Sequence, residues 1–235
     1  MNDKTSPLRE HSPHLSNILP QFWSLLSESE REELLIWSSY YIYKRGEVIY
    51  EPKSIPQNAY ILVHGQVKIT QDGDRTQILR LVRSKELFGY HAYFASGSSL
   101  TRASAVEDSL VCLIPIRSLE LILLANPRVG LYFMSDLSKR LRESREQTMS
   151  LTQKHTRGRL AESLLLLKDK FGTEPDGHTI RAYLTRNELA DLSNMTTSNA
   201  VRTLRSFNDE GVIHLDGRRI TIRDEEKLQL ISKLG

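Results

Sequence analysis

The stretch LTRNELADLSNMTTSNAVRTL, residues 184–204, decides the fold of the C-terminal third of this 235-residue chain. Thr185 and Glu188 have the spacing of a capping box, which predicts that a short helix begins here. Asn194 suits the left-handed backbone of a tight turn, and Thr196 can cap a second helix that follows it. A short helix, a tight turn and a second helix with a polar, uncharged N-terminal face predict a helix-turn-helix, whose second helix enters the major groove of DNA.

The residues after this motif predict a β-hairpin. Val212–Leu215 and Arg218–Ile222 flank Asp216-Gly217, a dipeptide with a strong preference for the type I′ hairpin turn. An ordinary helical hairpin with solvated charges is the alternative. The caps, the turn and the hairpin agree in order and spacing, which favours a winged helix-turn-helix.

In this interpretation, DNA contacts come from the starts of both helices and from the tip of the wing. Arg202 can donate two hydrogen bonds to guanine, Asn199 can read adenine, and the wing arginines can reach phosphates. The predicted contact residues are Thr185, Arg186, Thr196, Thr197, Ser198, Asn199, Arg202, Arg218 and Arg219.

Upstream of this region, short apolar runs alternate with turn residues from about Tyr43 to Ile114. This spacing predicts a small antiparallel β-sandwich or barrel. Before it, Ser29 and Glu32 are spaced as a capping box that opens an amphipathic helix. The apolar runs are Val48–Tyr50, Tyr60–Val63, Val67–Ile69, Ile78–Val82 and Leu110–Ile114.

A long helix connects the two regions. Asn126-Pro127 supplies an N-cap followed by proline at the first helical position, and the helix runs to about Lys154. Apolar and small residues recur along it at alternating steps of four and three, which predicts a coiled-coil seam and a homodimer. The alternative, packing on its own β domain, fits the N-terminal end, where Val129, Tyr132 and Phe133 widen the apolar arc. The seam consists of Gly130, Met134, Leu137, Leu141, Ser144, Thr148 and Leu151.

The composition excludes several classes of protein. With 39% apolar and 26% charged residues the chain can fill a globular core, and its net charge of +3 is too small to prove a nucleic-acid partner. A lone cysteine, Cys112, excludes a disulfide framework, a zinc ribbon and a cysteine-ligated iron-sulfur cluster within one chain. The absence of a signal sequence and of an apolar run long enough to span a bilayer predicts a soluble, cytoplasmic protein. No sequence motif of a common enzyme class is present, so we expect neither an enzyme nor a metal site.

From Phe22 to Leu228 the chain resembles the catabolite-activator (Crp/Fnr) family of bacterial transcription regulators. The resemblance implies an α+β fold with a cyclic-nucleotide-binding-type β-roll, a long dimerisation helix and a C-terminal winged helix-turn-helix. It places a flexible tail at residues 1–21, the roll at 22–125, the helix at 126–153 and the DNA-binding domain at 154–235. The matching segments are Lys44–Glu47, Asn58–Ile69, Glu86–Gly89, Ala105–Ser109, Arg157–Ala161 and Phe207–Ile213.

The resemblance also implies partners. We expect a homodimer that binds a palindromic operator, is controlled by a small-molecule effector and has RNA polymerase as a further partner. A ligand-binding regulatory module that acts through a protein partner is the alternative function. The sequence leaves open the identity of the effector, the operator, and whether the protein activates or represses.

Departures from the family pattern concern the effector. Members that bind cyclic AMP generally carry an acidic residue after the glycine of the cassette, and an Arg-Ser pair for the cyclic phosphate. Here Tyr90 and His91 follow Gly89, and Ser99 and Leu100 stand at the approximate Arg-Ser positions. We therefore predict that cyclic AMP is not the physiological effector, because its anion and diol would lack partners.

Several residues are candidates for an effector pocket nonetheless. Haem is one alternative, with His91 and Tyr90 as axial ligands, although a lone histidine is more often structural. The candidate pocket residues are Gly89, Tyr90, His91, Arg102, Ser144 and Arg145.

The recognition helix also departs from the family pattern. Thr197-Ser198-Asn199 replaces the family's common Arg-Glu-Thr run, while Arg202 is kept, so the base preference should differ from that of the best-known members.

Overall fold

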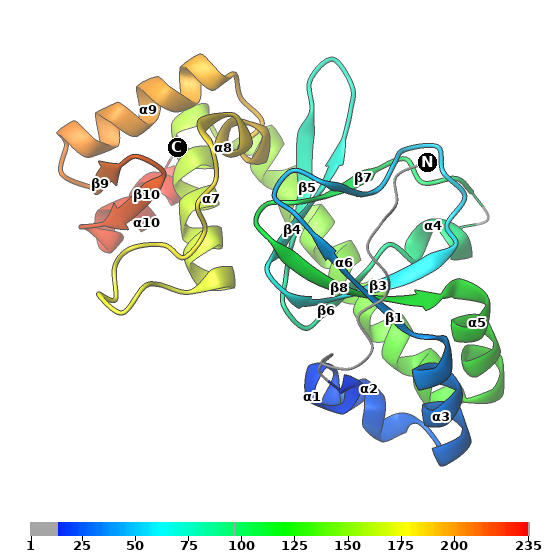
Figure 1. The fold of residues 1–235 in the computed structure, drawn as a ribbon. Coiled ribbons are helices and arrows are strands. Elements are labelled where there is room, and N and C mark those ends of the chain that lie inside the picture. The colour runs from blue at the N-terminus through cyan, green and yellow to red at the C-terminus, as the bar shows by residue number, and fades with distance from the viewer. Residues whose placement is uncertain (1–13, 96, 235) are drawn as a thin grey trace. The chain divides into compact units, whose positions relative to one another are not determined.

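The computed structural model describes residues 14–95 and 97–234, which form a mixed helix and sheet fold (Figure 1). The chain divides into two compact units. One joins the residues up to Gln71 with Leu79–Arg140, and the other joins Asp72–Ile78 with the residues from Leu141 onward. The predicted fold class, a β-roll followed by a long helix and a helix-turn-helix, is confirmed.

Three helices open the first unit: α1 (Leu15–Ile18), α2 (Pro20–Leu25) and α3 (Glu28–Trp37). The predicted loose tail is therefore wrong for residues 15–21, because Leu15 and Ile18 are buried in the core; residues 1–13 lie outside the described residues. The capping box also lies two residues nearer the N-terminus than predicted. Ser27 and Glu30, rather than Ser29 and Glu32, exchange the two bonds that start α3.

Eight strands form two four-stranded sheets that make up the roll. Every predicted apolar run lies within one of them. The first sheet has the order β1 (Ser39–Tyr43), β8 (Ser109–Pro115), β3 (Asn58–His64) and β6 (Glu86–Phe88). The second has the order β2 (Val48–Tyr50), β7 (Arg102–Ala105), β4 (Gln66–Gln71) and β5 (Gln77–Arg83).

The central strand β3 is buried on both faces. Ala59 and Ile61 pack into the cluster that the helices share with this sheet, whereas Tyr60 and Leu62 belong to a second cluster with residues of both sheets. This division follows from the two-residue period of a strand. Full burial of a side chain such as Ile61 contributes about 1.5–3 kcal/mol, so the two clusters hold the roll together from both sides of β3.

Helix α4 (His91–Phe94) lies between β6 and β7 in the chain, and helices α5 (Ile116–Ala125) and α6 (Pro127–Gln153) follow β8. Asn126 caps α6 as predicted, because its Oδ1 accepts from the backbone N–H groups of Arg128 and Val129 at 3.2 and 3.4 Å. Val129 and Phe133 pack into the core of the first unit, also as predicted. Farther along, the seam residues Met134, Leu137 and Leu141 are 56%, 40% and 54% exposed.

The second unit contains α7 (Thr156–Phe171), α8 (Arg186–Leu192), α9 (Thr197–Asp209), the hairpin β9 (Ile213–Asp216) and β10 (Arg219–Ile222), and α10 (Glu225–Leu234). Leu160 of α7, Leu204 of α9 and Leu228 of α10 are fully buried in this unit. Figure 1 shows α9 beside the hairpin, consistent with the contacts between α9 and β9.

The hairpin turn differs from the prediction by one residue. Arg219 pairs with Asp216, so the two connecting residues are Gly217 and Arg218 rather than Asp216 and Gly217. Gly217 has a φ of 55°, while Arg218 is not among the described residues with positive φ. The type I′ turn needs positive φ at both positions, so the predicted type I′ turn is wrong. The physical reason is that the left-handed conformation costs a residue such as Arg218 about 1–2 kcal/mol.

Candidate nucleic-acid interface and effector site

The two helices of the helix-turn-helix begin where their capping residues predict. The Thr185 hydroxyl oxygen accepts from the Glu188 N–H at 3.2 Å, and the Glu188 carboxylate accepts from the Thr185 N–H at 2.7 Å. Asn194 has a φ of 48° in the turn, and Thr196 accepts from the Asn199 N–H at 3.2 Å. Thr185 and Thr196 therefore each use their hydroxyl as a helix cap; whether they also contact DNA stays a prediction.

Helix α9 has one buried face and one open face. Ala200, Leu204 and Phe207 are fully buried, whereas Thr197, Ser198 and Arg202 are exposed and line a shallow hollow along the helix. Val201 is half-buried and lines the same hollow. The full lining is Thr197, Ser198, Val201, Arg202, Arg205, Ser206 and Asp209.

Arg205 and Asp209 were absent from the predicted contacts. Both are exposed in the hollow, three and seven residues after Arg202. The helical period of 3.6 residues places those positions on one face of α9 with Arg202, and this spacing is the signal that identifies them from the sequence.

The basic side chains of this surface differ in their surroundings. Arg202 donates through Nη2 to the amide oxygen of Asn199 at 2.6 Å. Arg186 donates through Nη2 to the Gly217 carbonyl oxygen at 2.7 Å, and its buried Nη1 has no hydrogen-bond partner within the described part of the chain. Burial lowers the pKa of Arg186. Arg218 and Arg219 are exposed at the end of the wing.

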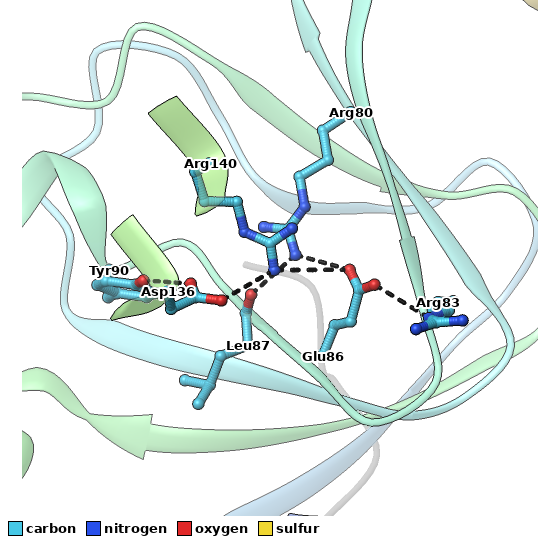
Figure 2. A network of polar contacts seen from close by, with 7 residues as sticks. All are labelled: Arg80, Arg83, Glu86, Leu87, Tyr90, Asp136 and Arg140. Carbon is cyan, nitrogen blue, oxygen red and sulfur yellow. Dashed lines mark hydrogen bonds and ion pairs between the residues drawn. The ribbon is translucent and has the colours of Figure 1, made fainter. Parts of the chain in front are cut away.

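In the first unit, a polar network joins the segment after β5 to helix α6 (Figure 2). The Tyr90 hydroxyl donates to the Asp136 carboxylate at 2.6 Å, and Arg140 donates to the other Asp136 oxygen at 3.2 Å. Glu86 accepts from Arg80 at 2.7 Å and lies 3.9 Å from Arg140. Two links thus fasten the Glu86–Tyr90 segment to α6: one through Asp136 and one through Arg140.

This network includes Tyr90, one of the two candidate haem ligands, and the other, His91, packs against it. Tyr90 is 1% exposed, and burial and the Asp136 carboxylate raise its pKa, so the hydroxyl stays protonated. The His91 ring stacks on the Tyr90 ring at 4.1 Å, and burial, reinforced by Arg80, lowers its pKa to about 4. The Tyr90 hydroxyl already donates to Asp136, so Tyr90 does not fit axial ligation of a haem iron, whereas the His91 Nε2 atom is buried without a hydrogen-bond partner among the described residues.

A cavity of about 280 Å³ opens in the roll, and Gly89 is the one predicted pocket residue that lines it. Gly89 has a φ of 79°, and a Cβ atom there would lie 2.5 Å from the Tyr60 ring, so a side chain at this position would displace Tyr60. The other residues that line the cavity are Ile49, Tyr50, Glu51, Ser54, Ile55, Pro56, Gln57, Asn58, Tyr60 and Ser99.

The remaining predicted pocket residues lie elsewhere. Arg102 is not part of the lining and donates to Glu51 at 2.8 Å. Tyr90 belongs to the network with Asp136, and His91 stacks on the Tyr90 ring. Ser144 and Arg145 are exposed on the part of α6 that belongs to the second unit. No lysine, arginine or histidine stands among the described residues that line this cavity, so it offers no counter-charge to a phosphate.

Comparisons with known proteins identify the two parts of the chain. Residues 42–126 match the model of the cyclic nucleotide-binding domain, and residues 158–231 match the model of the Crp-like helix-turn-helix domain. Among the residues that the structure describes, no helix is long and apolar enough to cross a membrane.

Relatives of known function are transcription regulators. The chain is 26% identical over 191 residues to the CRP-like cAMP-activated global transcriptional regulator of Mycobacterium tuberculosis, covering 79% of this chain and 84% of the relative. It is equally 26% identical over 191 residues to the fumarate and nitrate reduction regulatory protein of Escherichia coli, covering 79% and 75%. The solved structure of FixK2 from Bradyrhizobium japonicum has a TM-score of 0.74 at 23% identity, covering 83% of this chain and 96% of that one.

Proposed function

This chain belongs to the Crp/Fnr family of DNA-binding transcription regulators, and we propose that it acts as a homodimer that binds a palindromic operator through α9 and the wing. The observation that carries the proposal is the division of α9. Its apolar face is buried while Ser198 and Arg202 are exposed, as a helix inserted in the major groove requires.

The exposed seam of α6 supports dimerisation. Met134, Leu137 and Leu141 recur at steps of three and four and are between 40% and 56% exposed. A second copy of the helix would cover this stripe and remove its apolar area from water. In such a dimer two copies of α9 would read half-sites about one helical turn, roughly 34 Å, apart.

We propose that the roll senses a small molecule other than cyclic AMP. The relative from Mycobacterium tuberculosis is named as cAMP-activated, but the roll cavity of this chain has no lining cation for a cyclic phosphate. The signal would pass from the cavity through Gly89 and the adjacent Tyr90–Asp136 link to α6, as a population shift between two placements of the DNA-binding units.

The remaining expectations follow from this role. RNA polymerase is the expected further partner, and the cytoplasm is where such a regulator meets both the polymerase and its operator. We propose a division into the roll with its preceding helices (15–125), the dimerisation helix (126–153) and the DNA-binding domain (154–235). Relatives in the family use several effectors, and the cofactor of this chain is left unassigned.

Selection from random duplexes tests the proposal. The purified full-length chain is expected to enrich a palindrome whose half-sites are about 10 base pairs apart. Arg202→Ala should weaken binding by about 1–3 kcal/mol, mainly at one base pair of each half-site. A regulatory module that acts only through a protein partner predicts no enriched palindrome, and that result would refute the proposed function.

A further inference from the structure

The contact between Asn199 and Arg202 joins two side chains that were both predicted to read bases. Arg202 donates through Nη2 to Asn199 Oδ1 at 2.6 Å. Asn199 is held in the first turn of α9, because its own N–H donates to the Thr196 hydroxyl. The next residue, Ala200, is fully buried and fixes the helix against its unit. The backbone of Asn199 is therefore fixed, and its amide oxygen lies within reach of a side chain that is otherwise exposed.

Arg202 has no carboxylate partner among the described residues, so its guanidinium is oriented by this amide. The guanidinium has five N–H donors, of which Asn199 uses one. The others suffice for the pair of hydrogen bonds to guanine O6 and N7. Arg202 lines the hollow of α9, whereas Asn199 does not.

Asn199 is less well placed to read a base. Recognition of adenine by asparagine uses both the amide oxygen, which accepts from N6, and the amide nitrogen, which donates to N7. Here the oxygen already accepts from Arg202. Reading adenine with both amide groups would make this oxygen accept from N6 and from Arg202 at once, so the two roles compete for one atom.

We propose that Asn199 is a positioning residue: it holds Arg202 in the orientation that reads guanine, and it reads no base itself. The pair then specifies one base pair in each half-site instead of two. Holding the long arginine side chain before binding reduces the entropy lost when DNA orders it. This inference rests on the proposed function of α9 as the recognition helix.

The test measures base preference with the full-length protein. The duplex that the wild type enriches is prepared with each base pair of one half-site replaced in turn, and affinities are measured at a fixed salt concentration. Arg202→Ala is expected to lose about tenfold of the discrimination at one guanine. Asn199→Ala should lose part of the discrimination at the same base pair and none elsewhere. The double variant should discriminate no worse than Arg202→Ala.

A conservative variant and a matched control sharpen the result. Asn199→Asp keeps an acceptor oxygen for Arg202, so it should retain the preference at that guanine while binding every duplex more weakly, because the added charge opposes the phosphates. Arg205→Ala removes an arginine from the same hollow and should leave the preference at that guanine unchanged. In the DNA-free protein, nuclear magnetic relaxation of the Arg202 Nε–H should show greater mobility in Asn199→Ala than in the wild type.

Other outcomes overturn the inference. If Asn199→Ala relaxes a different base pair, with additive losses in the double variant, Asn199 reads its own base. If Asn199→Ala changes neither the base preference nor the mobility of Arg202, the contact has no role. Failure of the wild type to enrich any duplex is a separate result that refutes the proposed function itself.

Discussion

Arg186, the first residue of α8, donates to the carbonyl oxygen of Gly217 in the turn of the wing at 2.7 Å. The two residues are 31 positions apart in the chain, and the contact ties the start of the helix-turn-helix to the tip of the hairpin. Since Arg218 follows Gly217 directly, this bond also fixes the backbone from which the exposed wing arginine extends.

Replacement of Arg186 should loosen the wing in the absence of DNA. We expect Arg186→Ala to raise the backbone mobility of Gly217 and Arg218, measured by nuclear magnetic relaxation of the free protein, and to weaken operator binding roughly tenfold by loss of wing contacts. A variant at a simple phosphate contact would weaken binding without changing the free protein. Arg218→Ala, which removes the exposed wing arginine that is predicted to reach a phosphate, provides that comparison.

The Tyr90–Asp136 bond should contribute measurably to stability. Tyr90→Phe removes a 2.6 Å hydrogen bond to a partly buried carboxylate, so we expect the free energy of unfolding to fall by about 1.5–3 kcal/mol in urea denaturation. Tyr93→Phe removes a similar bond to Glu120 at a more exposed position and should cost less. Equal losses in the two variants would contradict a special role for the network.

His91 should make stability depend on pH. Its pKa is lowered to about 4 in the fold, chiefly by burial, whereas the unfolded chain has a histidine pKa near 6.5. Between these values the unfolded state binds more protons, so stability is complete above about pH 6.5 and falls as the pH drops toward 4. From pH 7 to pH 5 the loss should be about 2 kcal/mol.

The control for this prediction is a histidine that is exposed. In urea denaturation at both pH values, His91→Gln should lose about 2 kcal/mol less than the wild type, whereas His214→Gln should behave as the wild type does. An unchanged pH dependence in His91→Gln would show that other groups govern acid stability.

A charge in the α6 seam should prevent dimerisation. Leu141 is 54% exposed, so Leu141→Glu costs the protomer little, but in a dimer it would place two carboxylates at the helix contact. We expect a monomer by analytical ultracentrifugation and loss of operator binding. Lys139→Glu, a change of an exposed residue outside the seam, should remain dimeric.

Cyclic AMP should not bind the roll at micromolar concentration. Among the described residues that line the cavity there is no cation and one acid, Glu51, which accepts from Arg102. Calorimetric titration with cyclic AMP is expected to give no saturable heat up to about the millimolar range, the affinity of a ligand without its charged contacts. Saturation at low micromolar concentration would contradict both the sequence prediction and the cavity chemistry.

Local sequence alone determined the helix-turn-helix. Thr185, Glu188, Asn194 and Thr196 act on the backbone within three or four residues of themselves, so their caps and turn can be predicted without knowing the rest of the fold. The strand runs and the bounds of α6 follow similarly from the two-residue and helical periods of their apolar residues.

Tertiary structure alone decided how the polar side chains of both candidate sites are used. Tyr90 and His91 follow the cassette glycine in sequence, but Tyr90 bonds to Asp136, 46 residues away, and neither lines the cavity. Arg186 is predicted to contact DNA, and the fold also gives it a hydrogen bond to Gly217 across the motif. Composition and spacing identify residues able to bind a ligand or a phosphate. Only the packed structure shows which acceptors these side chains already bond to, because a partly buried donor forms a hydrogen bond with an acceptor that the fold places beside it.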